Sequence, residues 1–101
     1  MAFDMFANGN HERIDHHEEF LFALAGENEA RYPELLAVWE RFYDDPHISA
    51  RQAGVLVHEL IELLTQNGGI ANKPLAQVAA RLLSFFSLAY KSNIEVTCSS
   101  D

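Results

Sequence analysis

The chain has 101 residues, of which 49% are hydrophobic and 22% are charged, and its formal net charge at pH 7 is −8. This length and composition exclude a disordered chain and predict a single domain over residues 1–101 with a packed core. The negative charge argues against binding to nucleic acid or to an anionic membrane, because both attractions depend on lysine and arginine.

The acidic residues are concentrated in the first two thirds of the chain. Residues 1–62 hold thirteen Asp and Glu against four Arg, a balance of −9, whereas residues 63–101 hold two against three Lys and Arg, a balance of +1. The negative electrostatic field of residues 1–62 favours a basic partner protein and speeds the encounter with it. Acidic proteins are common, however, and the same charge can serve solubility alone. The sequence leaves both interpretations open.

The cysteine content and the apolar runs bear on location. The single cysteine, Cys98, cannot form an internal disulfide, which excludes a disulfide-stapled secreted fold. The first ten residues contain no basic segment followed by a long apolar stretch, so we expect no signal peptide. No apolar run approaches the length that spans a bilayer. These observations predict a cytoplasmic protein.

Residues 1–14 predict a short β-hairpin or an extended arm. Phe3 and Met5 fall on alternate positions, as in a strand with one buried face, and Asn8-Gly9 follows them. Asn-Gly is the strongest short-range hairpin signal, because both residues tolerate a positive φ. A hairpin of two strands is marginally stable alone, so we expect it to pack on helices.

Two shorter helices are predicted next. Asp15, with Glu18 three residues later, has the pattern of a capping box and predicts a helix that includes the apolar run 20–25. That run has no clean helical stripe, so a buried strand remains an alternative. The next helix is predicted to begin near Pro33, a residue favoured at the first helical position. It should end before Pro46, because the residue before a proline disfavours the α conformation.

A long amphipathic helix follows. Ser49 is its predicted N-cap, with Gln52 three residues later, and Asn67-Gly68-Gly69 is its predicted stop, because glycine adopts the left-handed conformation that ends many helices. Its apolar residues recur at helical spacing and predict a continuous buried stripe: Ala53, Leu56, Val57, Leu60, Leu63 and Leu64.

The last helix is predicted to start after Asn72, with Pro74 in its first turn. A broad apolar face predicts burial of Leu75, Val78, Ala79, Leu82, Phe85, Phe86, Ala89 and Tyr90. Beside it runs a stripe of small residues that can seat another helix of the chain or a second copy in a homo-oligomer: Ala76, Ala80, Ser84 and Ser87. Residues 95–101 are predicted to form a flexible tail, with a few extended residues within 94–98 as an alternative. The predicted fold class is mainly α, a small bundle of about four helices with or without the N-terminal hairpin.

Two groups of residues are candidates for metal binding. His58 and Glu62 are four apart on the long helix, so they share a face, but the zinc-protease pattern requires a second histidine where Glu62 stands. His11, His16 and His17 form the second group, although neighbouring residues on a helix point about 100° apart. Solvated polar side chains are the preferred explanation of both groups. We therefore predict no cofactor and keep metal binding by these residues as an alternative.

The sequence contains no assembled catalytic set. It has no Gly-x-Ser-x-Gly nucleophile motif, no phosphate-binding glycine loop and no Cys-x-x-Cys. Carboxylate pairs occur at 18–19, 44–45 and 59/62, but glycosidase chemistry needs two carboxyls across a cleft, and an acidic surface explains these pairs. We therefore expect a protein that is not an enzyme.

The segment 39–45 combines aromatic and acidic residues. Trp, Tyr and Arg dominate the energetics of protein interfaces, while the helical phase predicts that Trp39 and Phe42 belong to the core. The predicted partner-binding residues are Tyr43, Asp44, Asp45, Glu59 and Glu62. The leading hypothesis is a non-enzymatic domain that binds a basic protein, for example an immunity or antitoxin-like inhibitor that neutralises a basic toxin such as a nuclease. Metal binding and self-association are its alternatives.

Overall fold

The structure is a computed structural model that describes residues 2–100. The elements along the chain are β1 (Ala2–Ala7), β2 (Asn10–Asp15), the 3₁₀ turn η1 (His16–Glu18), α1 (Phe20–Gly26), α2 (Pro33–Glu40), β3 (His47–Ile48), α3 (Ala50–Gln66), the 3₁₀ turn η2 (Gly69–Ala71), α4 (Lys73–Lys91) and β4 (Val96–Ser100). The strands form one antiparallel sheet in the order β2-β1-β4-β3. The prediction of a mainly α bundle is therefore wrong, and the fold is mixed α/β.

The N-terminal hairpin is confirmed. β1 pairs with β2 from Ala2↔Asp15 to Ala7↔Asn10, which leaves Asn8 and Gly9 as a two-residue turn. Their φ angles are 46° and 90°, as a tight turn that matches the twist of the strands requires. The predicted segment 1–14 also includes Met1, which lies outside the described residues.

The predicted flexible tail is wrong for residues 96–100, which form β4 in the interior of the sheet. β4 pairs with β1 from Phe3↔Ser100 to Phe6↔Thr97 and with β3 through His47 and Ile48. Its burial alternates in the manner of a strand with one face on the core. The outward face is polar, which made the segment resemble a frayed end. Asp101 belongs to the predicted tail but lies outside the described residues.

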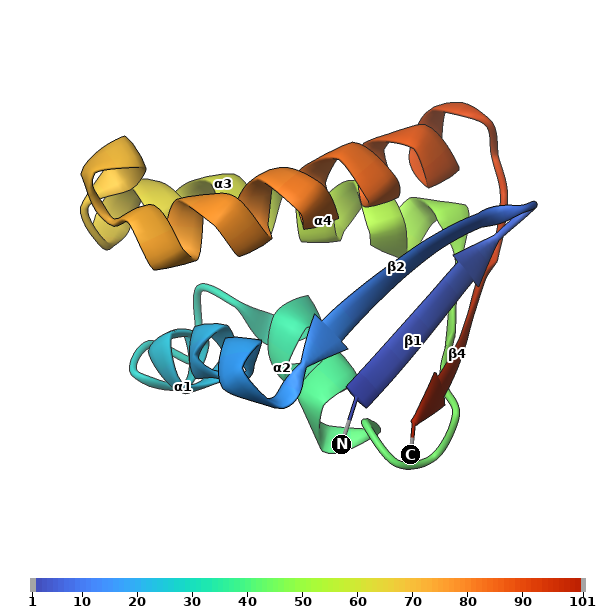
Figure 1. Ribbon diagram of the computed structural model, residues 1–101, viewed down its shortest axis with the longest axis horizontal. Helices are drawn as coiled ribbons and strands as arrows, with labels where there is room; N and C mark the ends of the chain where they lie inside the picture. Colours follow the sequence, from blue (N-terminus) through green and yellow to red (C-terminus); the bar gives the residue numbers. More distant parts are fainter. Residues whose placement is uncertain (1, 101) are drawn as a thin grey trace.

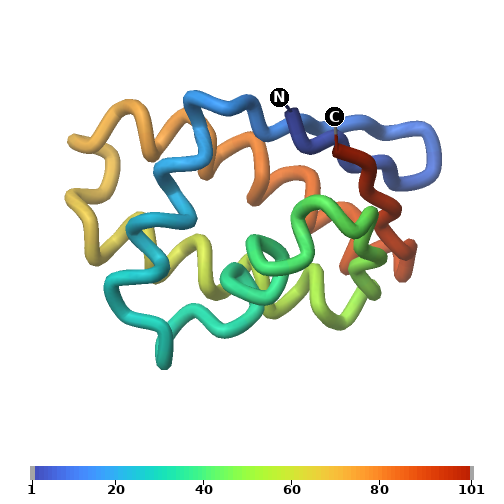
Figure 2. Tube along the Cα trace, turned by 90° about the horizontal axis from the view of Figure 1, so that it is seen from below, coloured from blue at the N-terminus to red at the C-terminus, as the bar shows by residue number. Residues whose placement is uncertain are grey.

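α3 and α4 lie side by side above the sheet, and α1 and α2 lie beside the lower part of the sheet (Figure 1). The two ends of the described chain are neighbours, as Figure 2 shows from below, because β1 and β4 are adjacent and antiparallel. Every strand and every α-helix contributes to one buried core. Its largest fully buried side chains include Phe3, Phe42, Met5, Ile14, Leu21 and Leu56.

The helix boundaries follow the local signals of the sequence. Ser49 caps α3, since its Oγ accepts the Gln52 N–H at 3.1 Å and the Gln52 side chain accepts the Ser49 N–H at 2.9 Å. Gly68 ends this segment with a φ of 103°. Asn72 caps α4, and α2 begins at Pro33 as predicted. The run 20–25 is helical, which excludes the alternative of a buried strand.

Among residues 2–100, none of the helices has both the length and the apolar character needed to cross a membrane.

Replacing Thr97 by proline tests whether β4 is an integral strand. Thr97 lies between partners on both sides, Phe6 and His47, so a residue without an N–H removes a ladder hydrogen bond. We expect Thr97→Pro to lower the free energy of unfolding by about 1–3 kcal/mol, the cost of a hydrogen-bonding group left unsatisfied. The exposed control Thr97→Val should change it by less than about 0.5 kcal/mol. Equal urea-unfolding midpoints for the two variants would show that the segment is a tail.

Candidate functional site

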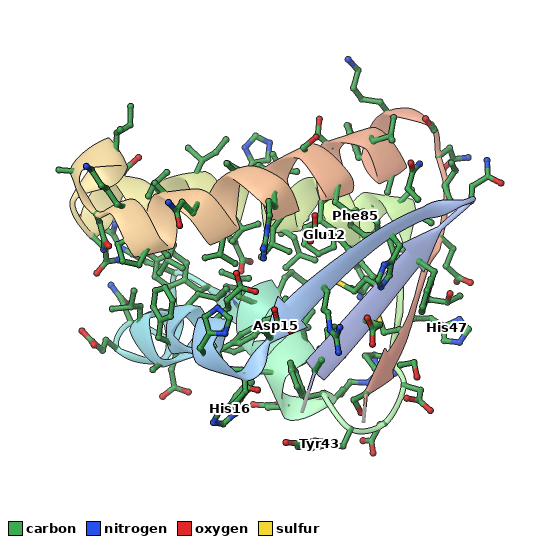
Figure 3. All side chains as sticks on the ribbon, in the orientation of Figure 1. Glu12, Asp15, His16, Tyr43, His47 and Phe85 are labelled. Atoms are coloured by element: carbon green, nitrogen blue, oxygen red, sulfur yellow. The ribbon has the colours of Figure 1, made fainter. Side chains whose placement is uncertain are left out.

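The chain turns sharply between α2 and β3, and this turn presents aromatic and acidic side chains together. We call this surface the acidic corner; it comprises Trp39, Glu40, Tyr43, Asp44 and Asp45. Tyr43 is 58% exposed and Trp39 is 39% exposed, while Glu40 and both aspartates are exposed. Figure 3 shows Tyr43 at the edge of the molecule farthest from α3 and α4.

Phe42 anchors the acidic corner in the core. Its side chain is only 1% exposed and stacks on Phe3 of β1, with ring centroids 4.4 Å apart. Trp39 stacks on Phe22 of α1 at 5.0 Å and also contacts Phe42 at 5.2 Å. Trp39 therefore packs against the core on one face and meets solvent on the other, so the prediction of a core tryptophan is only half correct. The rings of Tyr43 and Phe42 form a T-shaped pair, with their centroids 5.5 Å apart.

Backbone hydrogen bonds fix the two aspartates of the corner. The Asp44 N–H donates to the Arg41 carbonyl at 2.9 Å. The carboxylate of Asp45 accepts the Ser100 N–H at 3.3 Å, which ties the turn to the end of β4. Asp45 has a φ of 46°, a left-handed conformation that aspartate tolerates better than most residues. The three residues Tyr43, Asp44 and Asp45 therefore lie together on one ordered turn.

Glu59, predicted to contact a partner, is instead buried and 6% exposed. Its carboxylate accepts the N–H groups of Glu34 at 3.0 Å and Leu35 at 2.9 Å, at the first turn of α2. Tyr32, the N-cap residue of α2, provides no side-chain cap, so Glu59 caps this helix from α3. Burial raises the pKa of Glu59, and the two N–H donors offset only part of that increase. Glu59 is therefore not available to a partner.

Glu62 lies away from the acidic corner. Its carboxylate is 3.8 Å from the Arg31 guanidinium, which precedes the N-terminus of α2, whereas the acidic corner lies at the C-terminal end of that helix and in the turn after it. The eight residues of α2 separate the two by about 12 Å along the helix axis. The structure thus brings together Tyr43, Asp44 and Asp45 and leaves Glu59 and Glu62 outside the site.

The candidate metal ligands are dispersed. His11 contacts the Asp4 carboxylate at 2.8 Å and stacks on Phe6, while His16 is 3.4 Å from the Glu19 carboxylate. His58 is exposed on α3, far along the chain from the N-terminal histidines. His17, Asp15 and Glu18 do gather, with potential ligand atoms within 4.8 Å of one another. His17 belongs to the predicted ligand set, and Asp15 and Glu18 are carboxylates beside it in the sequence.

The carboxylate of Glu18 in that trio already has partners on both oxygens. One oxygen accepts the Asp15 N–H at 3.0 Å, and the other is 2.7 Å from the Arg81 guanidinium of α4. Burial alone would raise the pKa of Glu18, but Arg81 and the Asp15 N–H outweigh it and lower the pKa. Arg81 already supplies the positive charge beside this carboxylate, so Glu18 links η1 to α4.

The remaining predicted residues are separated by the fold. Ser87 faces a groove between α3 and α4, whereas Ala80 and Ser84 line a groove between α4 and β2, so the small-residue stripe is divided. Cys98 lies on the inward face of β4, and burial, with the nearby charge of Asp45, raises its pKa to about 12. Its thiol therefore stays protonated and unreactive near neutral pH.

Removing the Glu59 side chain tests its role as the cap of α2. Glu59→Ala leaves two N–H donors without an acceptor in a buried place, so we expect a loss of about 1–3 kcal/mol in the free energy of unfolding. Glu62→Ala is the matched control, because Glu62 is on the same helix and half-exposed, and it should cost less than about 0.5 kcal/mol. Similar urea-unfolding curves for both variants would disprove the capping role.

Glu18 and Glu59 should influence the pH dependence of stability in opposite directions. The pKa of Glu18 is lowered from the ordinary value of 4.5, so its stabilisation is present above that value and is lost as the pH falls. The pKa of Glu59 is raised, so its contribution is complete below 4.5 and is lost as the pH rises. Urea titrations from about pH 7 to about pH 3.5 should therefore show wild type losing its advantage over Glu18→Gln and gaining relative to Glu59→Gln. Parallel pH profiles for the two variants would contradict this assignment.

Comparisons of the chain with family models, with curated proteins and with solved structures gave no match. The function is therefore argued from the geometry of the site.

Proposed function

We propose that the protein is a non-enzymatic binding domain that engages a basic protein through the acidic corner. The most specific form of the proposal is an immunity or antitoxin-like inhibitor that covers the positively charged surface of a toxin such as a nuclease. A cytoplasmic location is part of it. The observation that carries the proposal is an exposed Tyr43 beside exposed Asp44 and Asp45 on a turn whose Phe42 is only 1% exposed.

The chemistry of the corner is that of an interface centre. Aromatic side chains such as Tyr43 and Trp39 offer large, stiff contact areas, and they are over-represented among the residues that dominate binding energy. The aspartates beside them supply the charge that a lysine- or arginine-rich partner recognises. Their location within residues 1–62, where the balance is −9, adds a long-range field of the same sign.

Preorganisation also favours this surface. A partner that binds a mobile loop must order it, which reduces affinity. Here Phe42 in the core and the hydrogen bond from Ser100 to Asp45 already hold the turn. A standard interface covers about 800 Å² of each partner, roughly one seventh of the 5698 Å² exposed by this chain. The acidic corner would therefore form the centre of a footprint that extends onto neighbouring elements.

The first experiment identifies the partner by a native pull-down at low salt, followed by elution in a salt gradient and mass spectrometry. A basic protein released in a stoichiometric amount would then be used for kinetics. We expect the corner variant Asp44→Lys/Asp45→Asn to slow association with that protein about tenfold at low salt, because steering depends on local charge. The effect should fade as salt rises. Asparagine is used at position 45 because it keeps the acceptor oxygen and tolerates the positive φ.

The control variant Glu27→Lys/Glu29→Gln changes the net charge by the same amount on the exposed loop between α1 and α2. It should slow association less than about threefold, because only the general field changes. Tyr43→Ala should mainly speed dissociation, since aromatic contacts form after the encounter. Equal slowing by the corner and control variants, with no effect of Tyr43→Ala, would rule out the acidic corner as the binding surface.

A further inference from the structure

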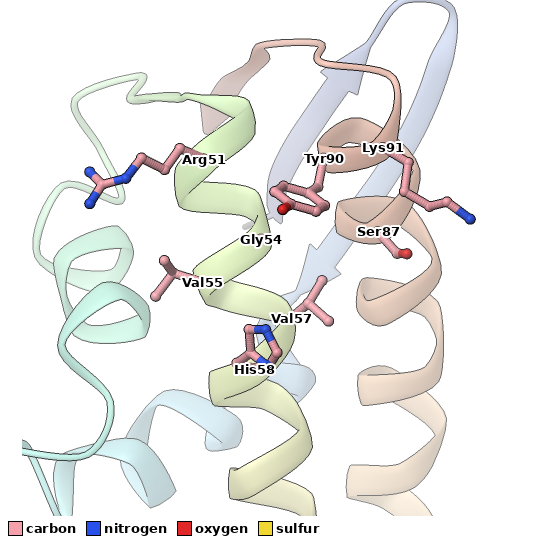
Figure 4. A pocket seen from close by; sticks show the side chains of 8 residues that line it. All are labelled: Arg51, Gly54, Val55, Val57, His58, Ser87, Tyr90 and Lys91. Atoms are coloured by element: carbon pink, nitrogen blue, oxygen red, sulfur yellow. The ribbon is translucent and has the colours of Figure 1, made fainter.

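A groove on the surface formed by α3 and α4 has features that the acidic corner does not use. It lies between the N-terminal half of α3 and the C-terminal end of α4 and has a volume of about 410 Å³. Figure 4 shows Gly54 and Val57 of α3 facing Tyr90 and Ser87 of α4 across it. Its volume is within the range of about 300–1,000 Å³ that is common for small-molecule sites.

The close approach of Gly54 and Tyr90 forms the floor of this groove. A Cβ atom at position 54 would lie 2.6 Å from Cδ1 and 2.8 Å from Cε1 of Tyr90, so only glycine allows the ring to lie against the helix backbone. Glycine weakens the interior of a helix relative to alanine. Yet Tyr90 remains 56% exposed, so the contact does not serve to bury this ring in the core. It places an aromatic face along the groove.

The walls of the groove are mainly apolar. Val55 and Val57 line it from α3, and Val55 is exposed although it belongs to an otherwise amphipathic helix. Together with the Tyr90 ring they provide a surface suited to a hydrocarbon chain or an aromatic ring. In Figure 4 Val57 and Tyr90 lie between the two helices and Val55 extends from the side of α3 away from α4, so the apolar part of a ligand would lie across α3 and against the Tyr90 ring.

The charge of the groove is opposite to that of the chain. Arg51 and Lys91 line it, and none of its described lining residues is acidic, whereas the whole chain has fifteen acidic against seven basic residues. Because α3 and α4 are antiparallel, Arg51 in the first turn of α3 and Lys91 in the last turn of α4 stand at the same end. In Figure 4 they flank that end on opposite sides with their charged groups directed outward. Both are exposed, long side chains that can turn towards a bound anion.

We infer that this groove binds a small amphipathic organic anion. The anionic head group would lie at the end flanked by Arg51 and Lys91, and the apolar body would extend over Tyr90 towards His58. The inference is independent of the proposed partner at the acidic corner, because the two surfaces share no residue. Charge complementarity selects the anion, and the apolar lining selects its body.

The test compares decanoate with decylamine, two probes with the same chain length and opposite head-group charge, below their micelle-forming concentrations. Binding to the full chain is followed by the backbone amide shifts in NMR spectra. We expect saturable shifts with decanoate at Gly54, Val55, Tyr90 and Lys91 and no such pattern with decylamine. No saturable shifts with decanoate, or the same pattern with decylamine, would overturn the inference. So would a dimer in solution in which a second copy covers the groove.

Variants of the groove make the test specific. Arg51→Glu/Lys91→Glu should weaken decanoate binding about tenfold, since two favourable charges are reversed. The control Arg41→Glu/Lys73→Glu makes the same change in net charge outside the groove and should leave the affinity within about twofold. Gly54→Ala should retain the fold, because alanine favours the helix, and should weaken binding by displacing the Tyr90 ring. Unchanged affinity in the Arg51/Lys91 variant would overturn the inference whether or not Gly54→Ala folds.

Discussion

The hydrogen bonds from the first turn of α2 to the Glu59 carboxylate link the two halves of the molecule. α2 has eight residues, too few to be stable as an isolated helix, and its own N-cap residue offers no side-chain acceptor. Its start therefore depends on a carboxylate from α3, and its end carries Phe42 and the acidic corner. Burial opposes the negative charge of Glu59, and the paired N–H groups at a helix N-terminus compensate for part of that cost. The position of the acidic corner, at the C-terminal end of α2, thus depends on contacts at the N-terminal end of the same helix.

A second polar link holds the sheet against the helices. Arg81 of α4 pairs with Glu18 of η1 and also donates to the Arg13 carbonyl of β2 at 3.2 Å. β2 is an edge strand of the sheet, and unpaired carbonyls on such an edge invite pairing with other chains. Arg81 satisfies one of these groups and covers part of the edge. The same side chain thus protects the hairpin and neutralises a nearly buried carboxylate.

The features that were predicted correctly from the sequence are those determined by neighbouring residues in the chain. Asn8-Gly9, Pro33 and the Ser49 cap located the hairpin and two helix starts, because each acts on its immediate neighbours. The place of β4 in a sheet was not predicted, because it pairs with β1 from the far end of the chain and its outward face is polar. In the candidate site, Tyr43, Asp44 and Asp45 were predicted as partner-binding residues because the segment 39–45 combines aromatic and acidic side chains. The role of Glu59 was missed because helical periodicity cannot reveal which other helix needs an acceptor.

The two proposed surfaces depend on different parts of this architecture. The acidic corner requires α2, whose first turn is held by Glu59, and Phe42 after the helix, which packs on Phe3 and Phe22. The groove requires only α3 and α4, which are long helices with caps supplied by their own flanking residues, Ser49 and Asn72. The net charge of −8 does not reveal that the two surfaces differ in charge, since it is the sum over an acidic turn and a groove lined by basic side chains. The location of each charge in the fold, rather than the total, therefore determines which ligands the protein can distinguish.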